Sequence, residues 1–141
     1  MSFEDSVPLF WRRIASHYRL VGTQCINPDC AKIFFPPRHL CPDCSLETEE
    51  NVNLSGRGQV VSYTIIYTAP SGKELQAPYC MAIIELEEGI PITAQITGID
   101  PVEVFMGMQV KAAFRKHGSF SKSGLLHYGF KFVPADYPRK T

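Results

Sequence analysis

The sequence predicts a mainly β protein in which an N-terminal helix precedes a small cysteine-rich module and a five-stranded barrel. Three observations carry this prediction. Apolar residues recur at helical spacing near the N-terminus, four cysteines fall in two close pairs, and short β-branched and aromatic runs fill the chain beyond residue 56. We expect a helical segment over residues 1–22, the cysteine-rich module over 23–50, and the barrel with a C-terminal tail over 51–141.

The N-terminal helix is predicted from the segment that follows Ser6. Five apolar residues recur there at spacings of mostly three and four: Val7, Phe10, Trp11, Ile14 and Tyr18. This pattern is typical of one amphipathic helix, or of two short ones. So short a helix cannot bury a Phe and a Trp by itself, and we expect a sheet, the cysteine-rich module or another chain to cover them.

Five strands are expected beyond Gly56-Arg57-Gly58, whose glycines we interpret as a flexible entry to the first strand. Each strand is a run bounded by turn residues, and Glu88-Gly89 is a tight hairpin signal between the second and third. Five strands of this length and spacing suggest a small closed barrel such as an OB-fold. The predicted strands span residues 59–68, 79–87, 90–97, 109–116 and 126–133.

The cysteine pairs predict a metal site. Four residues separate Cys25 from Cys30, two separate Cys41 from Cys44, and ten lie between the pairs. A close pair on each of two turns supplies four thiolates, the tetrahedral donor set that zinc binds. We therefore expect a rubredoxin-like zinc ribbon with a closed, structural Zn²⁺ site, although iron also binds in sulfur tetrahedra. A redox pair at Cys41 and Cys44, or four unligated thiols, are the competing interpretations.

The remaining cysteine and the hydropathy of the chain indicate a reducing compartment. Five cysteines are an odd number for a disulfide framework, and Cys80 lies alone in an apolar run, where we expect it to be buried. No stretch reaches the roughly 18 apolar residues of a membrane span, and the first residues do not resemble a signal peptide. We expect a cytoplasmic protein that does not enter a membrane.

No arrangement of catalytic residues is recognisable in the sequence. The histidines, which are His17, His39, His117 and His127, are scattered, and no Ser or Cys lies in a nucleophile turn. The sequence therefore favours a binding protein without catalytic residues over an enzyme.

Basic residues gather in the last third of the chain. The whole chain is neutral, with 14 basic and 14 acidic residues. From Gln109 onward, however, Asp136 is the single acidic residue beside seven basic ones: Lys111, Arg115, Lys116, Lys122, Lys131, Arg139 and Lys140. This excess of positive charge could attract an anion.

Several motifs together resemble the two-domain proteins associated with acyl-CoA metabolism, which combine a zinc ribbon with an OB-fold. The motifs follow one another over almost the whole chain: Phe10-Trp11, Cys-x4-Cys, Phe35-Pro36-Pro37-Arg38, Cys-Pro-x-Cys, Gly56-x-Gly58, Ser62-Tyr63-Thr64 and Gly107-Met108-x-Val110. The first cysteine turn holds four residues where family members commonly have two. The resemblance implies a non-catalytic scaffold encoded with thiolases or related acyl-CoA enzymes.

One archaeal group within this family looks like the bridging subunit between acetoacetyl-CoA thiolase and hydroxymethylglutaryl-CoA synthase of the mevalonate route. Membership in that group would imply both enzymes as partners and CoA or acyl-CoA as a ligand. A CoA site needs cations near its opening and an apolar slot behind them. The candidate cations are Arg12, Arg13, Arg38, Lys73 and the C-terminal basic residues, and the candidate walls are Phe10, Trp11, Phe34 and Phe35.

Nucleic-acid binding is the alternative, because zinc ribbons and OB-folds both bind RNA or single-stranded DNA. The C-terminal basic excess favours it. The zero net charge disfavours it, as do Tyr63, Tyr67 and Tyr79, which lack interleaved basic residues. A third possibility is an accessory subunit that contributes a residue to the active site of a partner.

Overall fold

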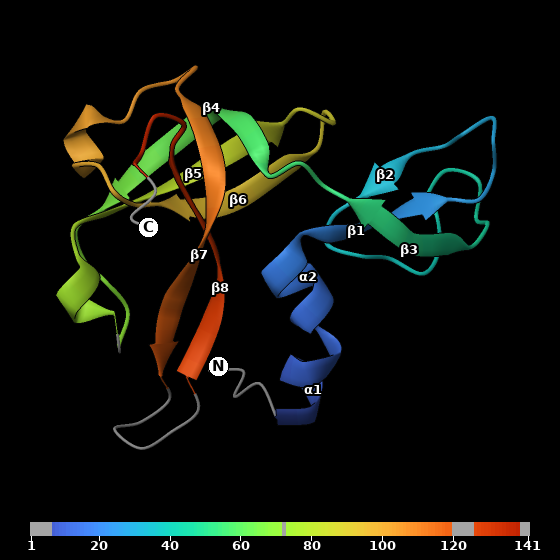
Figure 1. Ribbon diagram of the computed structural model, residues 1–141, viewed down its shortest axis with the longest axis horizontal. Helices are drawn as coiled ribbons and strands as arrows, with labels where there is room; N and C mark the ends of the chain where they lie inside the picture. Colours follow the sequence, from blue (N-terminus) through green and yellow to red (C-terminus); the bar gives the residue numbers. More distant parts are fainter. Residues whose placement is uncertain (1–6, 72, 120–125, 139–141) are drawn as a thin grey trace. The chain divides into compact units, whose positions relative to one another are not determined.

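The N-terminal segment forms two short helices instead of one. In the computed structural model, which describes residues 7–71, 73–119 and 126–138, these helices are α1 (Val7–Arg12) and α2 (Ile14–Arg19), of six residues each (Figure 1). Arg13 interrupts the helix with φ −99° and ψ 3°, and Leu20 follows α2 in the left-handed conformation. The prediction of a single helix is therefore wrong, and the alternative of two short helices is confirmed. No helix among the described residues is long and apolar enough to cross a membrane.

A small antiparallel sheet follows the helices. Its strands are β1 (Val21–Cys25), β2 (Ile33–Phe34) and β3 (Thr48–Asn53), in the order β2-β1-β3. The sheet and the helices belong to one structural unit, Met1–Leu54. Among its described residues, the buried apolar side chains are few: Leu20, Leu54 and the thiols of Cys25 and Cys41. So few buried side chains in the sheet and its turns contribute little to stability, and the ribbon needs another source of order.

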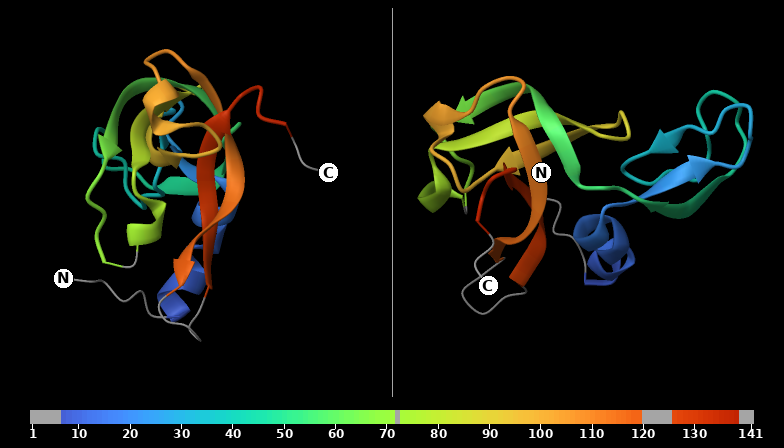
Figure 2. Two further views of the ribbon diagram at one scale, coloured as in Figure 1. Left: turned by 90° about the vertical axis from the view of Figure 1, so that its left-hand side faces the viewer. Right: turned by 45° about the horizontal axis from the view of Figure 1, so that its top comes forward.

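Five strands of the second unit, Ser55–Thr141, close into a barrel (Figures 1 and 2). The strand order is β4-β5-β6-β8-β7, and β7 pairs with β4 to complete the ring. All pairs are antiparallel except β6 with β8, which is parallel. The prediction of five strands is confirmed, with ends shifted by at most three residues: β4 (Arg57–Ile66), β5 (Tyr79–Leu86), β6 (Pro91–Ile96), β7 (Gln109–Ser119) and β8 (Leu126–Pro134). The connections contain the 3-10 turns η1 (Glu74–Gln76) and η2 (Pro101–Glu103).

Alternation along the strands fills the interior of the barrel. In β5 and β6, buried and exposed side chains follow one another with the period of two that a strand imposes. The interior side chains are Val60, Ala82, Ile84, Ile92, Ile96, Val110 and Phe132. Cys80 is buried, as expected. The hairpin at Glu88-Gly89 is also confirmed, since Gly89 has a φ of 75° and its amide donates to the carbonyl oxygen of Leu86.

Gly58 is part of the barrel wall and not a flexible entry. It is buried in β4, opposite Leu86 of β5 and Val110 of β7. A Cβ atom at this position would lie 2.3 Å from the carbonyl oxygen of Glu85. The interpretation of this glycine as a flexible entry is therefore wrong, because its missing side chain allows two backbones to approach each other.

Replacing Gly58 with alanine is expected to lower the free energy of unfolding by about 2 kcal/mol, because the added methyl group forces β4 and β5 apart. The neighbouring Gln59 is exposed, so Gln59→Ala should change that free energy by less than about 0.5 kcal/mol. Urea unfolding followed by far-ultraviolet circular dichroism measures both variants. Equal midpoints for Gly58→Ala and Gln59→Ala would show that the strands tolerate a side chain at this position.

Candidate functional site

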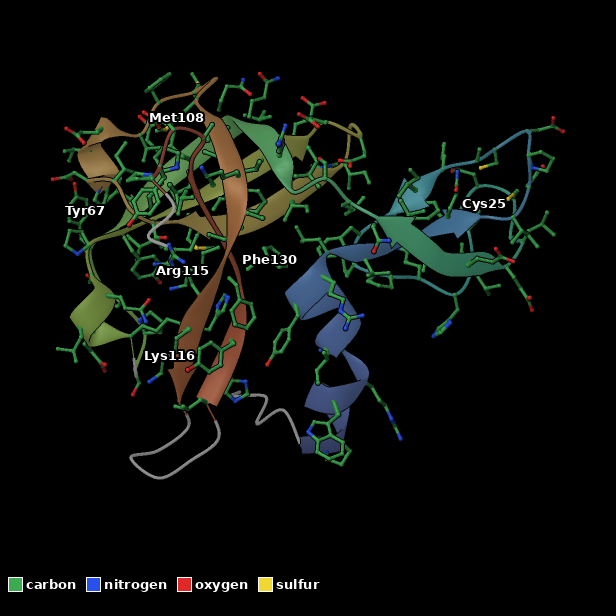
Figure 3. All side chains as sticks on the ribbon, viewed as in Figure 1. Cys25, Tyr67, Met108, Arg115, Lys116 and Phe130 are labelled. Atoms are coloured by element: carbon green, nitrogen blue, oxygen red, sulfur yellow. The ribbon has the colours of Figure 1, made fainter. Side chains whose placement is uncertain are left out.

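The four paired cysteines converge on one point of the ribbon. Their Sγ atoms all lie within 4.8 Å of one another, and Cys25 comes from the end of β1 (Figure 3). Sγ of Cys25 lies 3.3 Å from Sγ of Cys44, and Sγ of Cys30 lies 3.7 Å from Sγ of Cys41. In a zinc tetrahedron with Zn–S bonds of 2.3 Å, neighbouring sulfurs stand about 3.8 Å apart. The donor set and its spacing therefore fit a structural Zn²⁺ ion.

Two equivalent turns hold the thiols in place. The amide of Cys25 donates to the carbonyl oxygen of Lys32 at 2.9 Å, and the amide of Cys41 donates to that of Leu46 at the same distance. In each turn, the residue directly after the second cysteine has positive φ: Ala31 at 44° and Ser45 at 57°. The longer first turn thus closes in the same way as the second. An exposed ion pair between Lys32 and Asp43 links the two turns.

The surroundings of the thiols differ between the two turns. The backbone amides of Cys44 and Asp43 donate to the sulfur of Cys41 and lower the pKa of that thiol to about 7. Burial raises the pKa of the Cys25 thiol to about 12. Zinc binds thiolates, so the amides around Cys41 favour the form that the metal needs, whereas Cys25 needs the charge of the ion to give up its proton.

Of the candidate CoA-binding residues, Arg38 and Phe34 of the ribbon lie together. The guanidinium carbon of Arg38 lies 6.0 Å from the centre of the Phe34 ring, within cation–π range. The backbone of Arg38 is fixed, since its amide donates to Oγ1 of Thr23 at 3.1 Å and its carbonyl accepts from Oγ1 of Thr48. Phe35, the residue after Phe34, is half-buried. Arg38 therefore presents an exposed charge on a rigid base.

The other candidates lie elsewhere. Trp11 in α1 is 69% exposed, and Arg12 and Arg13 after it are exposed too, whereas the side chain of Phe10 lies outside the described part of the structure. Lys73 belongs to the barrel unit, in the connection between β4 and β5. Three of the C-terminal basic residues, Lys122, Arg139 and Lys140, lie outside the described residues.

Sequence reasoning missed an exposed apolar loop between β6 and β7. Val102, Phe105 and Met106 are all more than half exposed there, and the amide of Gly107 donates to the carbonyl oxygen of Val60 at 2.7 Å. The signal for this loop in the sequence was a pair of adjacent large apolar residues, Phe105 and Met106, between Pro101 and Gly107. From the sequence alone, such residues are expected in the core, because apolar side chains are usually buried.

The fold and the cysteine set define a protein that joins a zinc-ribbon module to an OB-fold barrel. Family models match both halves of the chain: the ChsH2 rubredoxin-like zinc ribbon domain over residues 12–49, and the ChsH2 C-terminal OB-fold domain over residues 51–115. The chain belongs to this ChsH2/DUF35 family. The resemblance inferred from the motifs is confirmed.

Relatives in the family carry informative names. A "DUF35 domain-containing scaffold protein" of Methanocaldococcus jannaschii is 46% identical over 127 residues, which are 89% of each chain. The "Benzoylsuccinyl-CoA thiolase subunit BbsA" of Thauera aromatica is 33% identical over 62% of this chain and 63% of that one. A solved structure described as "Ltp2-ChsH2(DUF35) aldolase" superposes with a TM-score of 0.69 at 30% identity and covers 89% of this chain and 92% of that one.

Proposed function

We propose that the protein is a non-catalytic, cytoplasmic scaffold subunit that binds CoA or acyl-CoA and associates with a thiolase and a hydroxymethylglutaryl-CoA synthase. The observation that carries the proposal is the 46% identity to the archaeal scaffold protein over 89% of both chains. The name of the BbsA relative, a thiolase subunit, supports a partner of the thiolase class. Four thiolates around Zn²⁺ would leave no position for substrate, so the metal would act in folding alone.

Exposed apolar side chains support a role in assembly. Trp11 in the first unit and Phe105 and Met106 in the second all expose more than half of their surface. Large aromatic and Met side chains are enriched in protein–protein interfaces, where they act as anchors. A scaffold with two partners needs such anchors, and each unit of this chain supplies at least one.

Arg38 is the proposed ribbon contact for the CoA phosphates. Its exposed guanidinium can donate several hydrogen bonds to a phosphate, and its fixed backbone limits the entropy lost on binding. The half-buried Phe34 beside it offers apolar surface for the uncharged arm of CoA.

Co-purification tests the proposed function. A tagged protein should retain a thiolase from the same organism through size-exclusion chromatography at micromolar concentration, and should retain the synthase through the same complex.

Arg38→Ala should weaken CoA binding by about tenfold, because one charge-assisted contact is lost. Arg57→Ala removes an equal charge from an exposed position of the barrel and serves as the control. Independent migration of the protein and the thiolase would contradict the scaffold function.

A further inference from the structure

The second half of β4 has a neighbouring strand on one side only. β4 pairs with β7 over residues 57–59, where it completes the ring, and with β5 as far as Ile66 (Figure 1). Val60 still faces the β7 side, because its amide donates to the carbonyl oxygen of Met108. Beyond Val60, β5 is the one described strand that pairs with β4. Residues 61–66 therefore form an open edge of the barrel.

The backbone groups of Tyr63 and Ile65 face the open side. Leu86 in β5 faces β6, since its amide donates to a carbonyl oxygen of the hairpin between β5 and β6. Backbone groups alternate in direction along a strand, so Ile83 faces β4, where Ser62 lies opposite. Ser62 and its alternate neighbours bond to β5, and the residues between them point away. Among the described residues, no backbone–backbone hydrogen bond outside the strand ladders involves Tyr63 or Ile65.

The side chains of the open edge are exposed and uncharged. Burial alternates in the first half of β4, but the four residues from Val61 to Thr64 are all exposed. The ten residues 59–68 include no charged residue, glycine or proline. Proteins usually protect a strand edge with charges, proline or bulges, and the bulge in β4 lies at the start of the open edge. Residues 62–66 are thus suited to pair with another strand.

The other seam of the barrel, between β6 and β8, is less suitable for strand addition. β8 faces β6 at Phe132, whose carbonyl oxygen accepts from the amide of Thr97. Phe130, two residues earlier, faces the same side. Its carbonyl oxygen lies 3.1 Å from Nε2 of His117, so a side chain already occupies this edge of β8.

The sequence of the open edge is complementary to itself in the antiparallel direction. With a two-fold axis at Tyr63, this residue lies opposite its own copy, Ser62 lies opposite Thr64, and Val61 lies opposite Ile65. Aromatic pairs, hydroxyl pairs and pairs of β-branched residues are the cross-strand contacts that stabilise antiparallel sheets. No like charges meet in this register. Two-fold symmetry is also the commonest arrangement of homo-oligomers, because one surface serves both subunits.

We propose that the open edge pairs with the open edge of a second copy of this chain and forms a two-fold symmetric dimer. The inference goes beyond the proposed function and does not depend on it. In the dimer, the two Tyr63 residues exchange two backbone hydrogen bonds, and β4 of each barrel gains its missing neighbour. The paired segment is short, so we expect a reversible dimer at micromolar concentrations, as for other small interfaces.

Sedimentation equilibrium of the full chain from about 1 to about 200 µM tests the proposal. The average mass should rise from the 15.8 kDa of one chain toward twice that value. Tyr63→Lys and Tyr63→Glu each place like charges opposite each other across the axis, and each should weaken dimerisation by at least about tenfold. An equimolar mixture of the two variants brings opposite charges together and should restore dimerisation to within about threefold of wild type. Such recovery excludes unfolding as the cause of the loss.

Thr93→Lys is the matched control, because it adds the same charge at an exposed position of β6, which has a neighbour on each side. It should change dimerisation by less than about twofold. Amide hydrogen exchange locates the contact. Protection of the Tyr63 and Ile65 amides should rise with protein concentration, whereas that of the Ser62 amide, which bonds to β5, should stay constant.

Three outcomes would overturn the proposal. The first is a wild-type chain that remains monomeric at about 200 µM. The second is a mixture of the two Tyr63 variants that associates no better than either variant alone. The third is protection of the Tyr63 and Ile65 amides that arises only when the thiolase is added, which would assign the open edge to a strand of that enzyme.

Discussion

Replacing Cys41 with serine is expected to abolish zinc binding and to unfold the ribbon unit while the barrel stays folded. Binding of a structural Zn²⁺ ion contributes about 10 kcal/mol or more to the folding of such modules. The ribbon has few buried apolar side chains to compensate, and Ile26, Leu40 and Leu46 remain exposed in it. Elemental analysis should return one zinc per wild-type chain and none for the variant.

Amide hydrogen exchange measures which strands lose their structure in Cys41→Ser. Residues 21–53 should lose their protection in Cys41→Ser, and the five barrel strands should keep theirs. Cys80→Ala, which changes a buried thiol of the barrel, is the control that should leave the zinc content unchanged. A Cys41→Ser protein that keeps full protection over β1 and β3 would show that packing alone folds the ribbon.

Replacing Phe132 with alanine should have the second-largest effect, on the barrel. Phe132 has no exposed surface, pairs with Ala112 of β7 and with Ile96 of β6, and meets Phe130 edge-on with ring centres 6.0 Å apart. The cavity left by the ring should lower the free energy of unfolding by about 3–5 kcal/mol. Phe105, which is 57% exposed, provides the control, and Phe105→Ala should cost less than about 0.5 kcal/mol. Urea unfolding measures both, and similar losses would contradict the central place of Phe132.

The cluster of four cysteines could be predicted from the sequence because its geometry is local. Two short turns fix the positions of four thiols, so the spacing of the cysteines along the chain determines most of the geometry of the cluster. The strands were also predictable, since alternation and turn residues act over a few positions. In these parts, the interactions that decide the structure lie close together in the chain.

The face that Lys111, Arg115 and Lys131 share on β7 and β8 could not be predicted, because it depends on the register of the two strands. Lys131 and Arg115 share a face only through the pairing of Ala113 with Lys131, and an irregularity interrupts the same ladder between Lys116 and Gly118. A slip of one residue would turn every side chain of β8 to the other face. The sequence shows an excess of charge but not the face on which it gathers.

Gly58 and Arg13 illustrate the same limit at single residues. A glycine can serve a positive φ or a close approach of two backbones, and only the position of Glu85 across the strand distinguishes these roles for Gly58. The apolar spacing of the first segment continues through Arg13, although the helix does not. The apolar periodicity shows which face of the segment is apolar, but it does not show whether the helix continues without a break.

The ring of the barrel limits where another chain could add a strand. β4 pairs with β5 over residues 58–66 but with β7 over residues 57–59, and β6 pairs with β8 at Ile96 and Phe132. Stretches available for strand addition in the barrel therefore lie at these two seams. In the small sheet the edge strands are β2, which has two residues, and β3, which begins Thr48-Glu49-Glu50, and such short or acidic edges discourage intermolecular strand pairing. Contacts made by side chains and loops can be altered by point substitutions that leave the backbone ladder intact.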